Sequence, residues 1–306
     1  EILKYSCLIF LYALSHSYLA TCFAIDLKIK GYEERYIGLS LSFWGIGVIL
    51  GALLHNLIRK KLNLISTILY GSLIQFTFSL IFLFDQNTYL VALMQFVMGI
   101  TSAINSLTLE SYISSKFRKS SGFYISLFWS SAGLGAIAGS LFIAINGINN
   151  FTYYLAVLFF LMHFIPIYLF RLSISKITVE NLSIRLSKNV LSKIKYLLIC
   201  VILFGVCDAG FSSLFPSYLL EENYSDKQIG RINFLAGAIA LFFYPFMGKL
   251  VDNYNKTIIF NLFCFINLLN LVALYSISEF YIYVICVAFY YYTIGTVFLI
   301  TFNIVG

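Results

Sequence analysis

Two ionisable side chains lie deep inside long apolar stretches of the sequence. His16 lies about 16 Å into the run 5–26, at 1.5 Å per residue, and Asp208 is similarly central in the run 196–220. A carboxyl group in a medium of low dielectric can exchange a proton near neutral pH, and histidine titrates there already. The two residues therefore predict a site that binds a proton or holds a charged substrate.

Each of these side chains also has a structural interpretation. The carboxylate of Asp208 can be satisfied by Ser212, one helical turn further on, or by another helix. The ring of His16 can stay neutral and hydrogen-bond to a serine or tyrosine hydroxyl. Because an ionisable residue at membrane depth is costly, function is favoured for Asp208, whereas both interpretations stay open for His16.

A polar stripe runs along the apolar segment 88–113. Thr101, Asn105 and Thr108 are spaced i, i+4, i+7, so they share one face of a helix. Such a stripe should face a cavity or another helix and not lipid. Thr101 and Asn105 therefore join the predicted substrate or proton site, although hydrogen-bonded helix packing is the more common use of such residues.

The composition places these residues in a membrane protein. Of 306 residues, 60% are hydrophobic and 11% are charged, and the mean hydropathy is +0.90. A soluble domain has about 25% charged and about 45–50% apolar residues. The net charge of +7 lies in short loops, so it predicts no nucleic-acid partner. The six cysteines fall in apolar stretches without metal-site spacing, and no cofactor or metal is expected.

Apolar runs separated by polar breaks predict ten membrane-spanning helices. Each run is about 20–25 residues long, enough to cross a hydrocarbon core of ~30 Å, and too long for the strands of a barrel. The pairs Gly47/Gly51 and Gly135/Gly139 predict close helix packing. The runs are 5–26, 36–58, 63–84, 88–113, 121–146, 151–171, 196–220, 228–250, 257–277 and 280–304.

Lys and Arg are distributed unevenly between alternate loops. With the N-terminus in the cytoplasm, most of the 20 basic residues are cytoplasmic, among them Arg59, Lys60 and those of the segment 172–195. The basic residues on the opposite side are mixed with acids. This bias predicts a multi-pass protein of the cell inner (plasma) membrane with a cytoplasmic N-terminus. Contact with anionic lipid headgroups is sufficient to explain the basic segment.

The sequence contains an internal repeat with an offset of 192 residues. His16 and Asp208 share this offset, so they are predicted to occupy equivalent positions on two helices. Transporters are often built from such repeated halves. The positions that recur are Phe23, Leu27, Tyr32, Ile37, Gly38 and Gly45, which match Phe215, Leu219, Tyr224, Ile229, Gly230 and Gly237.

The turn after the run 228–250 carries a recognisable signature. It reads Gly248-Lys249-Leu250-Val251-Asp252-Asn253-Tyr254-Asn255-Lys256 and resembles Gly-x-Leu-x-Asp-(Arg/Lys)-x-Gly-(Arg/Lys), the cytoplasmic signature of the major facilitator superfamily. Asn253 and Asn255 depart from it. The corresponding turn of the first half, from Gly51 to Lys60, has His55 where the acid belongs.

The resemblance implies an all-α polytopic fold of two pseudo-symmetric helical bundles, with six helices and four of an expected six. It also implies that the helices carrying His16 and Asp208 meet at a central cavity, that His163 lies outside this cavity in a structural role, and that Glu110 acts in gating. A snorkelling carboxylate is an equal alternative for Glu110. The stretches 109–113 and 133–139 are similar to the bacterial YcaD-like branch. The residues implied in gating are Glu110, Gly248, Asp252, Lys256, Arg59 and Lys60.

The expected domain organisation follows from these elements. Residues 1–171 form an amino-terminal six-helix bundle, 172–195 a basic cytoplasmic linker, and 196–306 a carboxy-terminal bundle of four helices. Members of the resembled family have twelve helices. The sequence is therefore expected to be a fragment that lacks the eleventh and twelfth.

The predicted function is secondary active transport of a small solute by alternating access, with protons or another ion as the coupling partner. ATP-binding and hydrolase motifs are absent from the sequence, so no enzyme activity is expected. A non-transporting membrane sensor or a degenerate pseudo-transporter is the alternative, since His55 interrupts the signature. A multi-pass membrane enzyme would need a cluster of catalytic residues at one interface.

Overall fold

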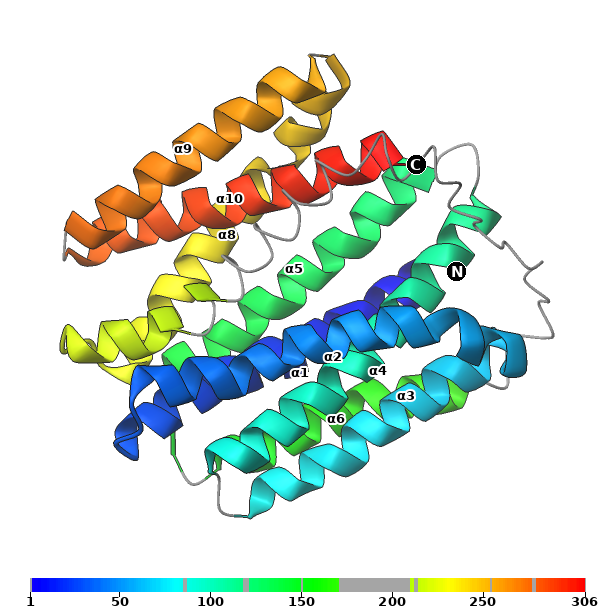
Figure 1. The fold of residues 1–306 in the computed structure, drawn as a ribbon, viewed down its shortest axis with the longest axis horizontal. Helices are drawn as coiled ribbons and strands as arrows, with labels where there is room; N and C mark the ends of the chain where they lie inside the picture. Colours follow the sequence, from blue (N-terminus) through cyan, green and yellow to red (C-terminus); the bar gives the residue numbers. More distant parts are fainter. Residues whose placement is uncertain are drawn as a thin grey trace.

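The computed structural model describes residues 2–84, 87–117, 121–149, 151–170, 210–211, 214–253, 255–276 and 279–305, and these ranges contain helices and turns but no strand. The all-α prediction is therefore confirmed. The helices lie lengthwise beside one another (Figure 1). They are α1 (Ile2–Ile29), α2 (Glu34–Lys61), α3 (Leu64–Ser79) with the short helix η1 (Leu80–Leu83), α4 (Thr88–Lys116), α5 (Ser121–Asn146), α6 (Thr152–Phe170), α8 (Asp226–Asn253), α9 (Lys256–Ser276) and α10 (Phe280–Val305).

Length and composition suit these helices to a membrane. Within the described ranges, α1 to α6 are each long and apolar enough to span one, with η1 counted together with α3. Shorter apolar stretches lie in α9 (Ile258–Leu274) and α10 (Phe280–Thr293). Most of the predicted seventh run lies outside the description, but its last residues, 214–220, are helical, and the helix continues to Glu221. The linker 172–195 also lies outside it, so the predicted domain boundaries stay a prediction.

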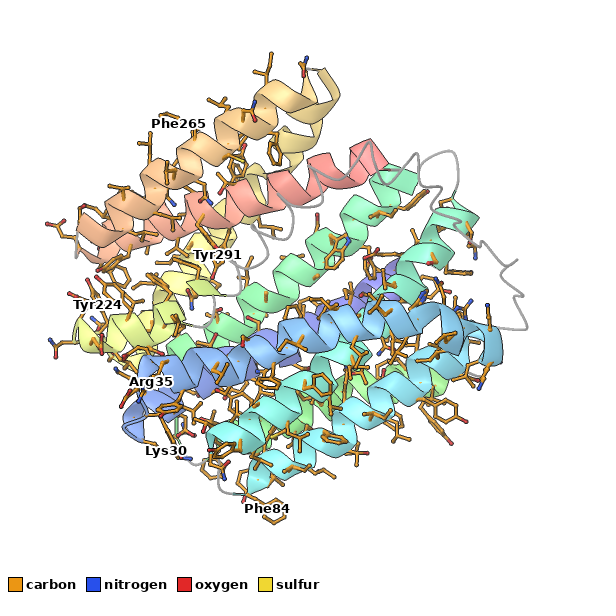
Figure 2. All side chains as sticks on the ribbon, viewed as in Figure 1. Lys30, Arg35, Phe84, Tyr224, Phe265 and Tyr291 are labelled. Atoms are coloured by element: carbon orange, nitrogen blue, oxygen red, sulfur yellow. The ribbon has the colours of Figure 1, made fainter. Side chains whose placement is uncertain are left out.

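The molecule has two ends, which we name after residues there. The Lys28 end carries the turns 30–33 and 222–225 and the residues 147–149 that follow α5. The Lys61 end carries the turn between α2 and α3, where Asn63 caps α3 by accepting a hydrogen bond from the amide of Ser66 at 2.8 Å. Figure 2 labels Lys30, Arg35 and Tyr224 on the left side of the view, which is the Lys28 end.

Glycines allow two helix pairs to pack backbone against backbone. A Cβ atom added at Gly47 of α2 would lie 2.1 Å from the carbonyl oxygen of Phe96 in α4. One added at Gly135 of α5 would lie 2.1 Å from that of Phe10 in α1. No side chain fits at such distances, so the predicted close packing at both glycine pairs is confirmed.

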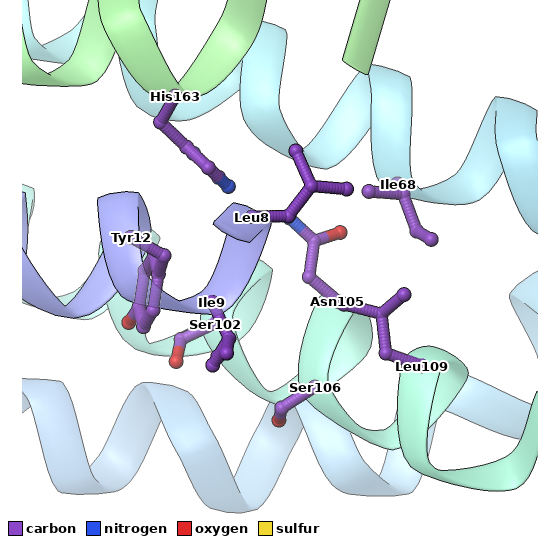
Figure 3. Close-up of a pocket in the computed structure, with 9 residues that line it drawn as sticks. All are labelled: Leu8, Ile9, Tyr12, Ile68, Ser102, Asn105, Ser106, Leu109 and His163. Carbon is purple, nitrogen blue, oxygen red and sulfur yellow. The ribbon is translucent and has the colours of Figure 1, made fainter. Parts of the chain in front are cut away.

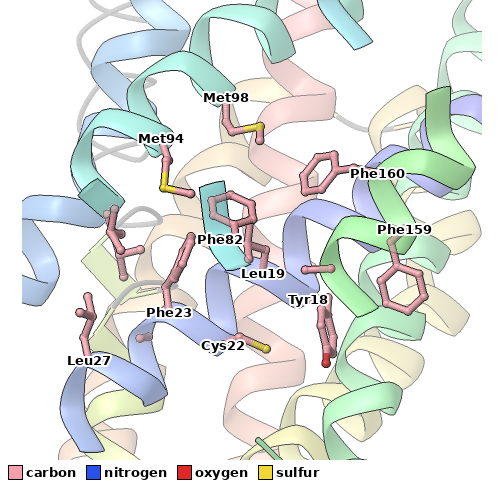
Figure 4. Packing of buried hydrophobic residues seen from close by; sticks show 14 of the residues in the cluster. Tyr18, Leu19, Cys22, Phe23, Leu27, Phe82, Met94, Met98, Phe159 and Phe160 are labelled. Atoms are coloured by element: carbon pink, nitrogen blue, oxygen red, sulfur yellow. The ribbon is translucent and has the colours of Figure 1, made fainter. Parts of the chain in front are cut away.

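Large apolar side chains fill the space between α1, α4, α6 and η1 (Figure 4). Phe23 and Phe82 pack edge to face with ring centroids 5.1 Å apart. Met94 and Met98 of α4 and Phe160 of α6 complete this cluster. It lies toward the Lys28 end and fixes α1 against its neighbours there.

The 192-residue repeat is visible in the backbone of two turns. Gly31 and Asn223 both have a positive φ angle, +83° and +63°. The amide of Tyr32 donates to the carbonyl of Leu27 at 3.1 Å, and that of Tyr224 donates to Leu219 at 3.0 Å. Both helices therefore end in the same left-handed cap, at positions 192 residues apart.

Candidate functional site

His16 lies at mid-length of α1 in an aromatic environment. Its ring centroid is 5.1 Å from the ring of Trp44 in α2 and 5.8 Å from that of Tyr12, one turn earlier in α1. The Nε2 atom of His16 and the Nε1 atom of Trp44 are both buried without a hydrogen-bond partner in the described part of the chain. Unpaired buried polar atoms are costly, so this pair is suited to receive a polar ligand or water.

Tyr12 connects His16 to a second histidine. The ring of Tyr12 lies 5.7 Å from that of His163 in α6, a residue that sequence reasoning treated as structural. The Tyr12 hydroxyl is buried and makes no hydrogen bond of normal geometry to a described residue, although Ser102 of α4 lies near it (Figure 3). The spacing of Tyr12 and His16, one helical turn apart, is a sequence signal for this group, whereas nothing local points to His163.

A small cavity lies next to this group. Its volume is about 10 Å³, close to the least that holds one water molecule and far too small for a solute. The buried Nδ1 atom of His163 and Oδ1 atom of Asn105 are both without a partner among the described residues. Residues of α1, α3, α4 and α6 line the cavity: Leu8, Ile9, Tyr12, Ile68, Ser102, Asn105, Ser106, Leu109 and His163.

The polar stripe of α4 is engaged within the amino-terminal helices. The hydroxyls of Thr101 and Thr108 donate to carbonyls of their own helix, those of Val97 at 3.0 Å and Ile104 at 2.6 Å. Asn105 turns toward α3, where its amide donates to Ser72 at 3.5 Å and packs against Gly71. These contacts are those of helix packing. A role of Thr101 and Asn105 in binding stays a prediction.

Predicted gating residues lie toward the Lys61 end. Glu110 of α4 lies beside Trp129 of α5. On α2, the Nη1 atom of Arg59 and the Nε2 atom of His55 are buried without a partner among the described residues, and Lys60 follows at the helix end. Gly248 and Asp252 belong to α8 and Lys256 begins α9, but their side chains lie outside the described set, as does all of Asp208.

Charged residues join the two bundles at the Lys28 end. The ammonium group of Lys28 forms ion pairs with Glu34 of α2 and with Glu221, which lies at the end of the helical stretch 214–221. Nearby, the hydroxyl of Tyr153 donates to the carboxylate of Asp26 at 2.7 Å. Lys28 is therefore shared between an acid of its own bundle and an acid of the other bundle.

The first residue of α8 makes a second connection. The Oδ2 atom of Asp226 accepts a hydrogen bond from the amide of Ile148 at 2.6 Å, in the turn between α5 and α6. Gly147, with a φ of +66°, leaves space for this carboxylate, since an added Cβ would lie 2.6 Å from Oδ2. Ser217 adds a contact of 3.4 Å to the carbonyl of Ala24 in α1.

The chain is similar in sequence pattern and in fold to known proteins. A family model described as Major Facilitator Superfamily matches residues 5–306. The chain belongs to the Major Facilitator Superfamily. The predicted family and fold class are thus confirmed, and membership of this family supports a membrane transporter. The narrower resemblance to the YcaD-like branch stays a prediction, because the model describes the superfamily as a whole. No curated protein sequence matches the chain.

Solved structures of transporters share the fold. A bacterial homologue of the human lysosomal transporter Spinster, inward-facing and unoccupied, has a TM-score of 0.77 at 12% identity, over 98% of this chain and 74% of that one. A D-xylose–proton symporter has a TM-score of 0.70 at 14% identity, over 96% and 80%. The nucleoside transporter NupG has 0.70 at 13%, over 100% and 80%. Identities this low establish the fold alone.

Proposed function

We propose that this Major Facilitator Superfamily protein is a secondary active transporter that moves a small solute by alternating access. The observation that carries the proposal is the set of separable polar contacts between the bundles at the Lys28 end. Lys28 pairs with Glu221, and the Ser217 hydroxyl donates to the carbonyl of Ala24, so side chains join the two halves without covalent constraint. Such contacts can break and re-form as one bundle rocks against the other.

The charge bias of the loops assigns a direction to this conformation. With a cytoplasmic N-terminus, the Lys28 end faces outward, and its cross-bundle contacts close the outer side. In this proposal the conformation is inward-facing, which is the state of the Spinster homologue in its solved structures. The gating residues Glu110, Arg59, Lys60, Gly248, Asp252 and Lys256 would close the opposite side in the other state.

The central site in this proposal consists of His16 and Asp208, with Thr101 and Asn105 near it. The unpaired Nε2 atom of His16 supports this choice, because it can accept a proton or donate a hydrogen bond to a solute. Asp208 occupies the matching position of the repeat, which the paired turns at Gly31 and Asn223 support. A carboxyl at this depth suits proton coupling.

Transport in proteoliposomes tests the coupling. D-xylose and a nucleoside, the solutes of two structural neighbours, head a panel for uptake driven by an imposed pH gradient. We expect Asp208→Asn to abolish gradient-driven uptake and to leave counterflow exchange. Unchanged gradient-driven uptake in Asp208→Asn would reject proton coupling through this residue. An absence of transport for every solute and ion gradient would favour the sensor or the degenerate pseudo-transporter.

A cross-link at the Lys28 end tests alternating access itself. In a background without native cysteines, Lys28→Cys with Glu221→Cys, joined by a short bifunctional thiol reagent, should stop transport, and a reducible reagent should allow recovery. The matched control, Asp26→Cys with Tyr153→Cys, joins two contacting residues of one bundle. Transport that continues in the cross-linked Lys28/Glu221 pair would contradict alternating access.

A further inference from the structure

A groove lies along the junction between α5 and α8. Its volume is about 500 Å³, and it is lined by Leu141, Ala144, Ile145, Lys227, Arg231, Phe234 and Leu235. Lys227 and Arg231 are one turn apart in the first two turns of α8, so both cations lie at the Lys28 end of the groove. The remaining lining is apolar, with residues from both bundles.

The groove is positively charged at one end and apolar along the rest, which is the pattern that matches an anionic amphiphile. Beyond Arg231, an apolar stripe on α8 continues at helical spacing, and Leu235, Ile239 and Phe242 are all exposed, the last by 70%. On α5, Ile145 is 62% exposed. The two cations lie at the level of the turns, where a membrane has its headgroups, and the apolar surface runs toward its hydrocarbon.

The positive charge of the groove is not neutralised by its neighbours. No carboxylate in the described part of the chain lies within ion-pair distance of Lys227 or Arg231. The nearest acid in sequence, Asp226, accepts hydrogen bonds from the amides of Ile148 and Lys227. Glu221 is paired with Lys28. The exposed Glu222 is the remaining acid of this turn.

We propose that the groove binds an anionic phospholipid, with its phosphate at Lys227 and Arg231 and an acyl chain along α5 and α8. Clustered cations attract anionic headgroups, and the apolar groove selects a lipid over a soluble phosphate. Because the lining comes from both bundles, the lipid also stabilises the closed arrangement of the Lys28 end. This last consequence rests on the proposed function, whereas the binding does not.

Native mass spectrometry of the purified protein with added phosphatidylglycerol or phosphatidylcholine tests the binding without a transport assay. We expect Lys227→Gln with Arg231→Gln to reduce phosphatidylglycerol binding about ten- to thirtyfold and to leave phosphatidylcholine unaffected. The control, Lys30→Gln with Arg35→Gln, removes the same charge at the same end, away from the groove. Since all four side chains are exposed, these variants should fold, and thermal unfolding in phosphatidylcholine checks this.

Three outcomes would overturn the proposal. The wild-type protein could bind both lipids equally, or the control could lose as much phosphatidylglycerol as the groove variant. Alternatively, inorganic phosphate at millimolar concentration could displace the lipid fully, which would indicate a phosphate site. A second variant, Ile145→Gln, probes the apolar part, and we expect it to weaken binding of the lipid several-fold without affecting that of inorganic phosphate.

Discussion

The turn that joins α1 to α2 and the turn before α8 have the same backbone but different contacts. Both end a helix with a residue of positive φ, Gly31 in one and Asn223 in the other. Just before the first turn, the long side chain of Lys28 at the end of α1 reaches the other bundle. The second turn is followed by α8, which packs directly on the backbone of α5.

One matched pair of glycines makes the difference plain. A Cβ added at Gly38 of α2 would meet the flexible tip of Leu214 at 3.1 Å. One added at the equivalent Gly230 of α8 would lie 2.4 Å from the backbone nitrogen of Ala144. At these two matched positions, α2 therefore meets the other bundle through a movable side chain, whereas α8 meets the backbone of α5. Lys28 can therefore part from Glu221 with little rearrangement, whereas α8 cannot shift against α5 at Gly230 without moving backbone.

The largest effect is expected at the backbone contact. Gly230→Ala should destabilise the protein by about 1–3 kcal/mol, because neither α8 nor α5 can yield locally to the added atom. Gly38→Ala should be neutral or stabilising by up to about 1 kcal/mol, since Leu214 can move and alanine favours a helix. Thermal unfolding of both variants in the same detergent compares the two directly. Equal losses of stability in the two variants would mean that the contact at Gly38 is as rigid as the contact at Gly230.

A smaller effect is expected at the acids that begin α2 and α8. Asp226→Asn keeps the shape of the side chain but has one oxygen for the two amides of Ile148 and Lys227, so one amide should lose its partner at a cost of about 0.5–1.5 kcal/mol. Glu34→Gln at the equivalent position should cost about 0–1 kcal/mol, because its ion pair is partly exposed and Lys28 keeps Glu221.

Thermal unfolding at low and high salt measures this second pair of variants. The Glu34→Gln effect should vanish in high salt, since an exposed ion pair is screened, whereas the Asp226→Asn effect should persist. If both effects disappeared in salt, the Asp226 contact would be electrostatic at long range and not a fixed hydrogen bond.

Much of the fold could be predicted because each membrane-spanning helix depends on its own residues and not on distant ones. A run of about 20 apolar residues must form a helix to satisfy its own backbone, so each span follows from its own sequence. The repeat was readable for a similar reason, since the pattern of Leu27, Tyr32 and Gly38 encodes one turn and the start of one helix. Close packing at Gly47 and Gly135 followed from glycine spacing alone.

The site was harder to predict because it depends on how helices face each other. Asn105 shares a face with Thr101 in the sequence, but which helix this face meets is set by the assembly, and Asn105 meets Gly71 of α3. Tyr12 and His163 are far apart in sequence, and no spacing rule links residues of different helices. The pair of Lys28 and Glu221 could not be predicted from the sequence for the same reason.

The smallest effect is expected at the paired turns themselves. Gly31→Asn should change the free energy of unfolding by less than about 0.5 kcal/mol, because Asn223 adopts the same left-handed conformation in the second turn. Asn223→Gly should be equally mild, as the strain it relieves is offset by the extra freedom of glycine in the unfolded chain.

Gly31→Val is the matched control for these exchanges. An added Cβ at Gly31 meets no atom within 4 Å. The loss of about 1–2 kcal/mol expected in the free energy of unfolding of Gly31→Val would therefore come from backbone strain and not from a clash. Thermal unfolding of Gly31→Asn, Asn223→Gly and Gly31→Val compares their stabilities directly. If Gly31→Asn were as harmful as Gly31→Val, the two turns would share a hydrogen-bond pattern but not a common tolerance for side chains, and the repeat would be a weaker guide to equivalent positions such as His16 and Asp208.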